Sequence, residues 1–301
     1  MKINLKNSKN YIYVALFAVF ILALLFQLIN ITWITFTYLK INSFSYLILA
    51  FLLIPLNQFM EWKKWELICS SFSISAENKR NGFFAGIGTG FISPNGWGNF
   101  IGRLFYVERK NRVFVILETA FGNLSQLLAT LVFGIVGLFF LSYSNVYLSF
   151  SIVALIGLLV VYFFSPSLLN YFFKNSKWNK RIQLFASNTF SFRIKILLFS
   201  LLRYVIFTLQ FAFIFKAFWP PLTFEYLFSH ITLVYLFTSI IPSFFSGKIL
   251  IRETVALSIF SEHESLHAVV IVSSLIIWLF NNILPAVFSS FVSLRMKKMK
   301  Q

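Results

Sequence analysis

The chain is dominated by apolar runs that are long enough to cross a lipid bilayer. A membrane-spanning helix needs ~20 mostly apolar residues to cross a hydrocarbon core ~30 Å thick. The chain has 58% hydrophobic and 12% charged residues and a mean hydropathy of +0.80. We therefore expect an all-α, polytopic helical membrane protein with about six full spans. The expected spans are residues 12–31, 44–62, 113–141, 146–165, 194–218 and 266–292.

Two further apolar regions, near 81–106 and 225–260, are interrupted by the same short pattern. The first copy has Pro94, Gly98 and Arg103, and the second has Pro242, Gly247 and Arg252. Broken backbone at membrane depth is tolerated only where it is buried in protein or lines a cavity. Paired interrupted segments in the two halves of a chain point to the binding site of a transporter-like protein. We expect two re-entrant broken-helix hairpins related as an inverted repeat.

The distribution of basic residues predicts the orientation of the chain. Of the 26 Lys and Arg residues, 20 lie in five stretches: the N-terminus, 63–80, 109–112, 174–195 and 295–300. The positive-inside rule places these stretches on the cytoplasmic side of a bacterial-type inner (plasma) membrane, with both termini cytoplasmic. The two hairpins then enter from opposite faces. The net charge of +17 fits anionic headgroups of the lipid bilayer better than a nucleic acid, which we do not expect as a partner.

We expect residues 1–301 to form a single integral membrane domain. Its halves are about 1–165 and 194–301, and an amphipathic cytoplasmic connector at about 166–193 joins them. The apolar run that follows the N-terminal lysines has no small-residue cleavage site, so we interpret it as an uncleaved first span. No loop is long enough for a soluble catalytic domain, and no motif indicates a nucleotide. We therefore expect no enzymatic activity and no cofactor.

The two arginines of the repeated pattern are the first candidate substrate-binding residues. Arginine suits bidentate recognition of phosphate, and we expect Arg103 and Arg252 each to lie near the start of a half-helix, where backbone amides add positive charge. Neighbouring glycines would let the backbone approach a headgroup closely. The candidate substrate-binding residues beside the arginines are Gly96, Gly98, Asn99, Gly247 and Glu253.

A polar and small stripe follows one face of the expected span 113–141. Its members recur every four residues: Glu118, Gly122, Gln126, Thr130 and Gly134. Such a stripe is most simply a helix-packing seam. Glu118 is costly inside a span unless it is paired or hydrated. We expect an ion pair between Glu118 and Arg203, with Gln126 and Gln210 nearby, to line a hydrated route.

Residues 263–267 match the H-E-x-x-H pattern, in which two histidines bind zinc and the glutamate acts as a general base. Here the histidines are His263 and His267, and His230 or Glu253 would have to complete the site. The simpler interpretation is a polar helix start, in which Glu262 and Glu264 complement the helix dipole. An intramembrane zinc hydrolase remains an alternative.

The segment from Gly86 to Arg103 resembles the flippase-like transmembrane family, the membrane domain associated with lysylphosphatidylglycerol synthases. The residues that carry the resemblance are Gly86, Gly88, Gly90, Ser93–Asn99 and Arg103, with Ile241–Pro242, Gly247 and Arg252–Thr254 as a second signature. The family often has Glu where this chain has Asn99. The resemblance covers about residues 10–292 and implies the membrane part without the synthase part.

These observations predict a membrane protein that binds and translocates an anionic phospholipid or a lipid-linked molecule between leaflets. In this interpretation Arg103 and Arg252 hold the phosphate, and Glu118 and Arg203 line the route. A second alternative is a non-transporting accessory protein for a lipid-modifying or glycosyl-transferring enzyme. The lipid, the direction of transport and the oligomeric state are left open.

Overall fold

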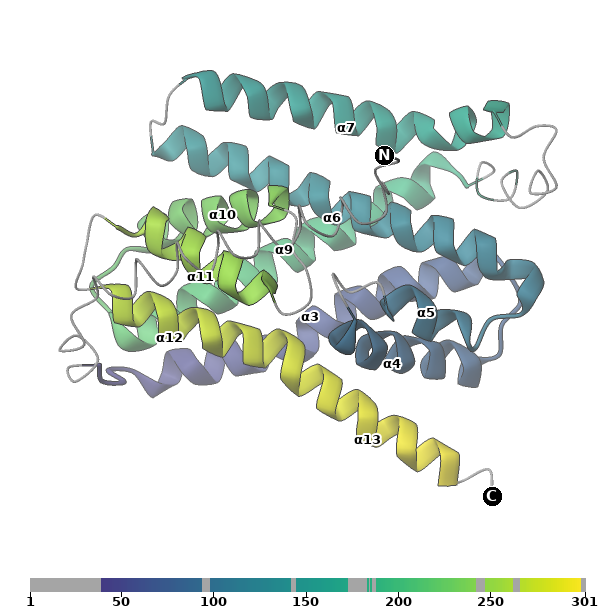
Figure 1. Ribbon diagram of the computed structural model, residues 1–301, viewed down its shortest axis with the longest axis horizontal. Helices are drawn as coiled ribbons and strands as arrows, with labels where there is room; N and C mark the ends of the chain where they lie inside the picture. Colours follow the sequence, from purple (N-terminus) through teal and green to yellow (C-terminus); the bar gives the residue numbers. More distant parts are fainter. Residues whose placement is uncertain are drawn as a thin grey trace, which may run out of the picture.

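The computed structural model describes residues 39–93, 98–141, 145–172, 183, 185, 188–241, 247–261 and 266–298. Within these ranges the chain forms a bundle of helices that run mostly along one common direction (Figure 1). The helices are α3 (Phe44–Ser70), α4 (Ala76–Ile92), α5 (Gly98–Leu104), η2 (Arg109–Asn111), α6 (Arg112–Phe140), α7 (Asn145–Phe172), α9 (Phe190–Phe218), α10 (Phe224–Ile240), α11 (Gly247–Ile259), α12 (His267–Trp278), the π-helical segment Leu279–Ile283 and α13 (Leu284–Lys298).

The all-α membrane architecture predicted from the sequence is confirmed. Five stretches of helix in the described part of the chain are long and apolar enough to cross a membrane: Phe44–Ser70, Arg109–Phe140, Val146–Phe163, Phe190–Phe218 and His267–Val292. The expected first span at 12–31 lies outside the described residues. So do residues 173–182, 184, 186 and 187 of the expected connector. At its two ends α7 continues to Phe172 and α9 begins at Phe190.

The two halves of the chain repeat the same series of elements. In the first half, the 27-residue α3 is followed by the 17-residue α4, the 7-residue α5 and the long α6. In the second half, the 29-residue α9 is followed by the 17-residue α10, the 13-residue α11 and the helix formed by α12 and α13. Residues 71–75 and 219–223 are connections of equal length. Both predicted hairpins, α4–α5 and α10–α11, are therefore present.

The equivalent helices α3 and α9 pack against each other in opposite directions. Ala217 O accepts from Asn42 N at 2.8 Å near the start of α3, and Gln210 Nε2 donates to Ala50 O at 3.0 Å. Further along α3, Arg203 Nε donates to Asn57 Oδ1 at 2.9 Å. Contacts that advance along α3 thus move back along α9, as an inverted repeat requires.

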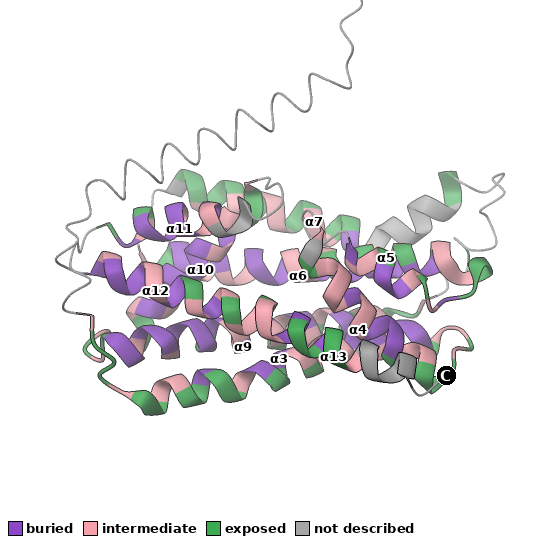
Figure 2. Ribbon diagram, turned by 60° about the horizontal axis from the view of Figure 1, so that its bottom comes forward, coloured by how far each residue is buried: buried purple, intermediate pink, exposed green. Residues whose placement is uncertain are grey.

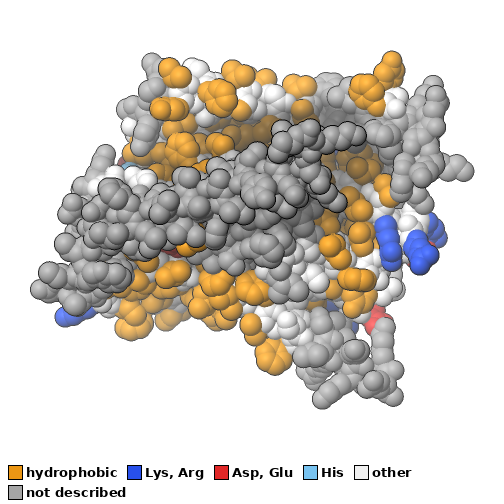
Figure 3. All heavy atoms as spheres, in the orientation of Figure 1, with side chains coloured by type: hydrophobic (Ala, Val, Ile, Leu, Met, Phe, Trp, Pro, Cys, Tyr) orange, Lys and Arg blue, Asp and Glu red, His pale blue; other side chains and the backbone are white. Residues whose placement is uncertain are grey.

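The two short hairpins lie at opposite ends of the bundle, with α4 and α5 at the right of Figure 1 and α10 and α11 at the left. We call the end that carries α4, α5 and η2 the basic end, because Lys63, Lys79, Arg80, Arg109 and Lys110 belong to it. Figure 3 shows Lys and Arg side chains gathered at this end, beside a face covered mainly by hydrophobic side chains.

Equivalent caps begin the two 17-residue helices. The Ser75 hydroxyl accepts from Asn78 N at 3.2 Å at the start of α4, and the Thr223 hydroxyl accepts from Tyr226 N at 3.2 Å at the start of α10. Each helix also has a glutamate in its first turn, Glu77 or Glu225, which complements the helix dipole. The repeat therefore extends to local sequence signals.

The buried core lies between the central helices, and the outer helices expose apolar side chains. Figure 2 shows buried residues concentrated on α6, α9 and α10, whereas α7 and one side of α3 are largely exposed. In a lipid-embedded bundle this outer surface faces acyl chains rather than water. Polar side chains in the interior therefore need partners within the protein.

Candidate functional site

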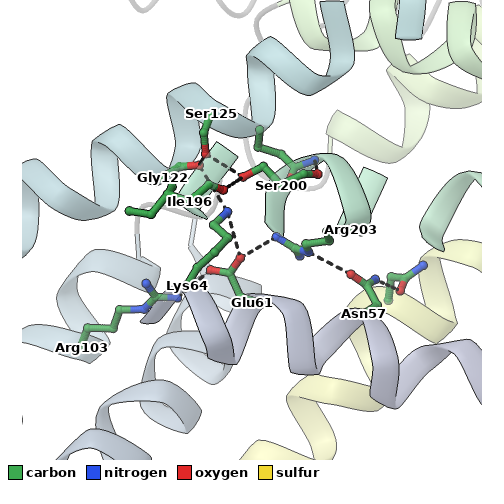
Figure 4. Close-up of polar contacts among 11 residues, drawn as sticks. Asn57, Glu61, Lys64, Arg103, Gly122, Ser125, Ile196, Ser200 and Arg203 are labelled. Carbon is green, nitrogen blue, oxygen red and sulfur yellow. Dashed lines mark hydrogen bonds and ion pairs between the residues drawn. The ribbon is translucent and has the colours of Figure 1, made fainter. Parts of the chain in front are cut away.

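Glu61 on α3 lies at the centre of a cluster of three cations contributed by α3, α5 and α9 (Figure 4). Glu61 Oε1 lies 2.8 Å from Arg103 Nη2, and Oε2 lies 2.8 Å from Arg203 Nη1 and 3.3 Å from Lys64 Nζ. We call these four residues the Glu61 cluster. It joins the first hairpin to the second half of the chain.

The cluster is buried on one side and open on the other. The side chain of Arg103 is 2% exposed and that of Lys64 is 5% exposed, whereas that of Arg203 is 27% exposed. The Arg103 guanidinium also lies over the Trp65 ring, 4.8 Å from its centroid. A ligand would therefore reach the cluster from the side of Arg203.

Glu61 and Lys64 point into the bundle because they share a face of α3 with buried apolar residues. Glu61, Lys64, Trp65 and Ile68 are spaced i, i+3, i+4 and i+7, so they share one helix face. Trp65 and Ile68 are buried in the core, and Trp65 Nε1 donates to Lys79 O at 2.8 Å. Packing of this face carries Glu61 and Lys64 into the interior. The expected span ended at residue 62, whereas α3 continues to Ser70, so Lys64 and Trp65 belong to this helix and are buried.

The polar network continues from the cluster in two directions. Arg203 donates a hydrogen bond to Asn57 on α3. Asn57 Nδ2 in turn donates to Asn281 Oδ1 of the π-helical segment, at 2.6 Å. On the other side, Lys64 Nζ donates to Gly122 O on α6 at 3.3 Å. The Ser125 and Ser200 hydroxyls, 2.6 Å apart, bridge α6 and α9 beside it. The network thus connects α3, α5, α6, α9 and the π-helical segment.

The cluster contains three cations and one carboxylate, which is a formal charge of +2. A charge inside a membrane-embedded bundle is costly unless it is paired or hydrated. Glu61 can neutralise one of the three cations. The Nε of Arg103 is a buried donor without a hydrogen-bond partner among the described residues. The remaining positive charge favours an anion at this place.

Arg103 is positioned by close packing between α4 and α5. A Cβ on Gly98 would lie 2.0 Å from Thr89 O, and one on Gly102 would lie 2.4 Å from Ala85 O. Gly98 N also donates to Ser93 Oγ at 2.6 Å. The space at the Cβ position of Gly98 is therefore filled by α4, and approach of a headgroup to this glycine stays a prediction. Gly96 lies outside the described residues.

Asn99 lies over the glycines of α4. Its Oδ1 would be 2.6 Å from a Cβ on Gly86, and its Cβ would be 3.3 Å from one on Gly90. This Oδ1 is buried without a hydrogen-bond partner in the described part of the chain. The acid that pairs with Arg103 is Glu61 on α3.

The two arginines of the repeated pattern have different surroundings. Arg252 on α11 donates from Nε to Ser274 Oγ at 2.9 Å and from Nη2 to Ser274 O at 2.7 Å. Glu253 is buried, with its Oε1 3.8 Å from Arg252 Nη2. Arg252 therefore binds α12, whereas Arg103 binds α3. A short helix begins five residues before each arginine, α5 at Gly98 and α11 at Gly247, so each arginine lies more than one turn beyond the helix start.

The expected ion pair between Glu118 and Arg203 is not formed. Arg203 binds Glu61 and Asn57 instead, and the Glu118 carboxylate accepts a hydrogen bond from Asn188 Nδ2. Glu118 is fully buried on α6. The pairing differs because α3 lies against α9 and presents its own carboxylate to Arg203.

The remaining stripe on α6 serves mainly to pack helices. A Cβ on Gly134 would lie 2.9 Å from the Leu236 side chain on α10. Gln126 Nε2 donates to Ser200 O at 3.4 Å, and Thr130 Oγ1 donates to Gln126 O at 3.1 Å. Gln210 Nε2 donates a hydrogen bond to Ala50 O on α3. The stripe therefore packs α6 against α9 and α10. At Gly122 it contacts the Glu61 cluster, through Lys64.

The H-E-x-x-H segment lies mostly outside the described residues, which resume at Leu266. His267 begins α12. In the described ranges, no group of three or more His, Cys, Asp or Glu side chains is arranged to hold a metal ion.

Comparison with known proteins yields no relative: no protein-family model matches the chain, and no curated protein matches it.

Proposed function

We propose that this membrane protein binds an anionic lipid or lipid-linked molecule at the Glu61 cluster and moves it between leaflets. The observation that carries the proposal is the excess of cations around one carboxylate whose side chain is 13% exposed. Arg203 supplies the exposed part of the cluster, and guanidinium groups bind phosphate through paired hydrogen bonds. The resemblance of the Gly86–Arg103 segment to the flippase-like family supports the same function.

The inverted repeat supports translocation rather than static binding. Two halves that enter the membrane from opposite faces can exchange access to one central site by rocking against each other. The Glu61 cluster links the α5 hairpin of one half to α9 of the other, so it lies where such a movement would change contacts. Arg252 and Ser274 form a separate polar contact inside the second half, between α11 and α12.

The test is exchange of fluorescent lipids between leaflets of proteoliposomes. The wild-type chain should accelerate exchange of an anionic lipid more than that of a zwitterionic lipid. Arg203→Gln should lower this rate by roughly tenfold or more, because a hydrogen bond to a charged group contributes about 1.5–3 kcal/mol. Arg109→Gln is the matched control, since Arg109 is exposed at the basic end outside the cluster.

Each result has a defined meaning. Acceleration by the wild type that is lost in Arg203→Gln and kept in Arg109→Gln supports the proposal. A folded wild type that moves neither lipid would contradict it and would favour the accessory-protein alternative. Equal rates for both arginine variants would show that the Glu61 cluster is not the site.

A further inference from the structure

A groove of about 960 Å³ opens on the outer surface of the bundle between α3, α4 and α13. Its lining is almost entirely apolar and includes exposed residues such as Phe59, Val287 and Phe291. Because these side chains lie on the lipid-facing surface, the groove opens sideways rather than to water at an end of the bundle. It is separate from the Glu61 cluster, none of whose residues lines it.

Helix irregularities shape this groove. The π-helical segment Leu279–Ile283 precedes α13, and Pro285 follows it, so the helix changes direction between α12 and α13. Figure 1 shows α13 leaving the bundle obliquely. It stays in contact with α4, where the Ser289 hydroxyl donates to Phe84 O and the Phe84 and Phe288 rings lie 5.9 Å apart.

The polar side chains that line the groove are Gln58 and Arg80, and the charged one, Arg80, lies toward the basic end. Arg80 belongs to the first turns of α4 and lines the groove there with Trp62, whereas Ile87 and Ile54 line its deeper part. None of the described residues forms an ion pair or hydrogen bond with the exposed Arg80 guanidinium. An apolar channel that ends at an exposed cation beside a tryptophan matches an acyl chain attached to an anionic headgroup.

The equivalent cleft at the opposite end differs in charge. The repeat pairs α3 with α9, α4 with α10, and α13 with α6. A smaller cleft of about 360 Å³ lies between α9, α10 and α6. Phe228 of α10 is equivalent to Arg80 of α4, because each follows the start of its helix by the same number of residues. The charged residue that lines this smaller cleft is Glu225. An anionic headgroup is therefore expected at the basic end and not at the other.

We propose that the groove between α3, α4 and α13 binds one acyl chain of an anionic phospholipid from the leaflet at the basic end, with the phosphate at Arg80. This site stands independently of the translocation proposed above, because binding here requires no movement between leaflets. A chain that binds phospholipid in the groove and moves none would retain this site and lose the proposed function.

The test measures lipid binding to the full chain in detergent. Native mass spectrometry at equal concentrations should show phosphatidylglycerol retained in preference to phosphatidylcholine. Arg80→Gln should weaken the retention of phosphatidylglycerol by about fivefold, because a basic residue near a membrane surface contributes about 1 kcal/mol to binding of anionic lipid. Arg109→Gln, at an equally exposed arginine outside the groove, should leave it unchanged.

A second measurement locates the acyl chain. Phosphatidylglycerol with brominated chains should quench the fluorescence of Trp62, whose contribution is obtained by difference from Trp62→Phe. Val287→Phe should remove this quenching by filling the groove. Val153→Phe is the matched control, since Val153 is an exposed residue of α7 outside the groove.

Loss of headgroup preference in Arg80→Gln together with loss of Trp62 quenching in Val287→Phe supports the proposal. Equal retention by Arg80→Gln and Arg109→Gln would overturn the headgroup assignment. Quenching that survives Val287→Phe would overturn the acyl-chain assignment, and so would a Trp62 that brominated lipid does not quench.

Discussion

Arg203 on α9 donates to Glu61 on α3 at 2.8 Å, which joins two helices that occupy equivalent positions in the two halves of the chain. The same carboxylate also forms an ion pair with Arg103, in which Nη2 lies 2.8 Å from Glu61 Oε1. One acidic residue therefore organises the first hairpin and the interface between the halves. The repeat is not symmetric here: counted back from the ends of α3 and α9, the position equivalent to Glu61 is Leu209.

Replacement of Glu61 by Gln should destabilise the protein strongly. The substitution leaves three cations in the interior without a carboxylate, and removal of one partner from a buried ion pair typically costs about 3–5 kcal/mol. The measurement is the free energy of unfolding in mixed SDS micelles. Glu66→Gln is the control, because Glu66 pairs with Lys63 at a site where both side chains are more than one third exposed. That change should cost about 0–1 kcal/mol, and equal losses for the two variants would contradict the central role of Glu61.

A double-mutant cycle should show coupling of Arg203 to Glu61 and not to Glu118. Contacting residues in one polar network typically couple by about 0.5–3 kcal/mol, whereas separate sites are additive. The cycle combines Arg203→Gln with Glu61→Gln, and a second cycle combines it with Glu118→Gln. Coupling is measured from the same unfolding free energies. Strong coupling in the Glu118 cycle alone would restore the pairing that we expected from the sequence.

The fold could be predicted from the sequence because the bilayer sets the length of its elements. Apolar runs located the long helices, and Pro and Gly marked the breaks of both hairpins. The repeat has a further signal that we did not use: Ser75-Ala76-Glu77 and Thr223-Phe224-Glu225 begin α4 and α10 with the same type of cap and the same acid.

The centre of the candidate site was missed for a physical reason. The expected second span ended at residue 62, which placed Glu61 at its edge, whereas α3 continues to Ser70. The spacing of Glu61, Lys64, Trp65 and Ile68 on one helix face was the available signal for burial. The partner of Arg203 depends on which helix lies beside α9, and that long-range arrangement is not contained in local patterns.

Gly98→Ala should destabilise the α4–α5 hairpin. A Cβ at this position would lie 2.0 Å from Thr89 O and 2.7 Å from Ser93 Oγ, so the two helices would have to separate. Overpacking of a tight interior costs about 1–3 kcal/mol. Gly157→Ala on α7 is the matched control, because beyond its chain neighbours and its own helix backbone none of the described residues lies within 4 Å of the added Cβ. Thermal unfolding in detergent should show a lower midpoint for the first variant and an unchanged or higher one for the second; the reverse order would argue against this packing.

Arg252→Lys should weaken the contact between α11 and α12 even though it keeps the positive charge. Arg252 reaches Ser274 through two nitrogens, with Nε 2.9 Å from Oγ and Nη2 2.7 Å from the carbonyl oxygen. A lysine ammonium is a single point donor on a flexible stem and does not reproduce this fork. The expected loss is about 0.5–1.5 kcal/mol for the one hydrogen bond that is not replaced, measured by unfolding in mixed SDS micelles. Ser274→Ala removes only the hydroxyl acceptor and should lower the free energy of unfolding by a similar amount. In the Ser274→Ala background, Arg252→Lys should lower this free energy by less than it does in the wild type. Full additivity of the two changes would mean that Arg252 acts through a partner other than Ser274.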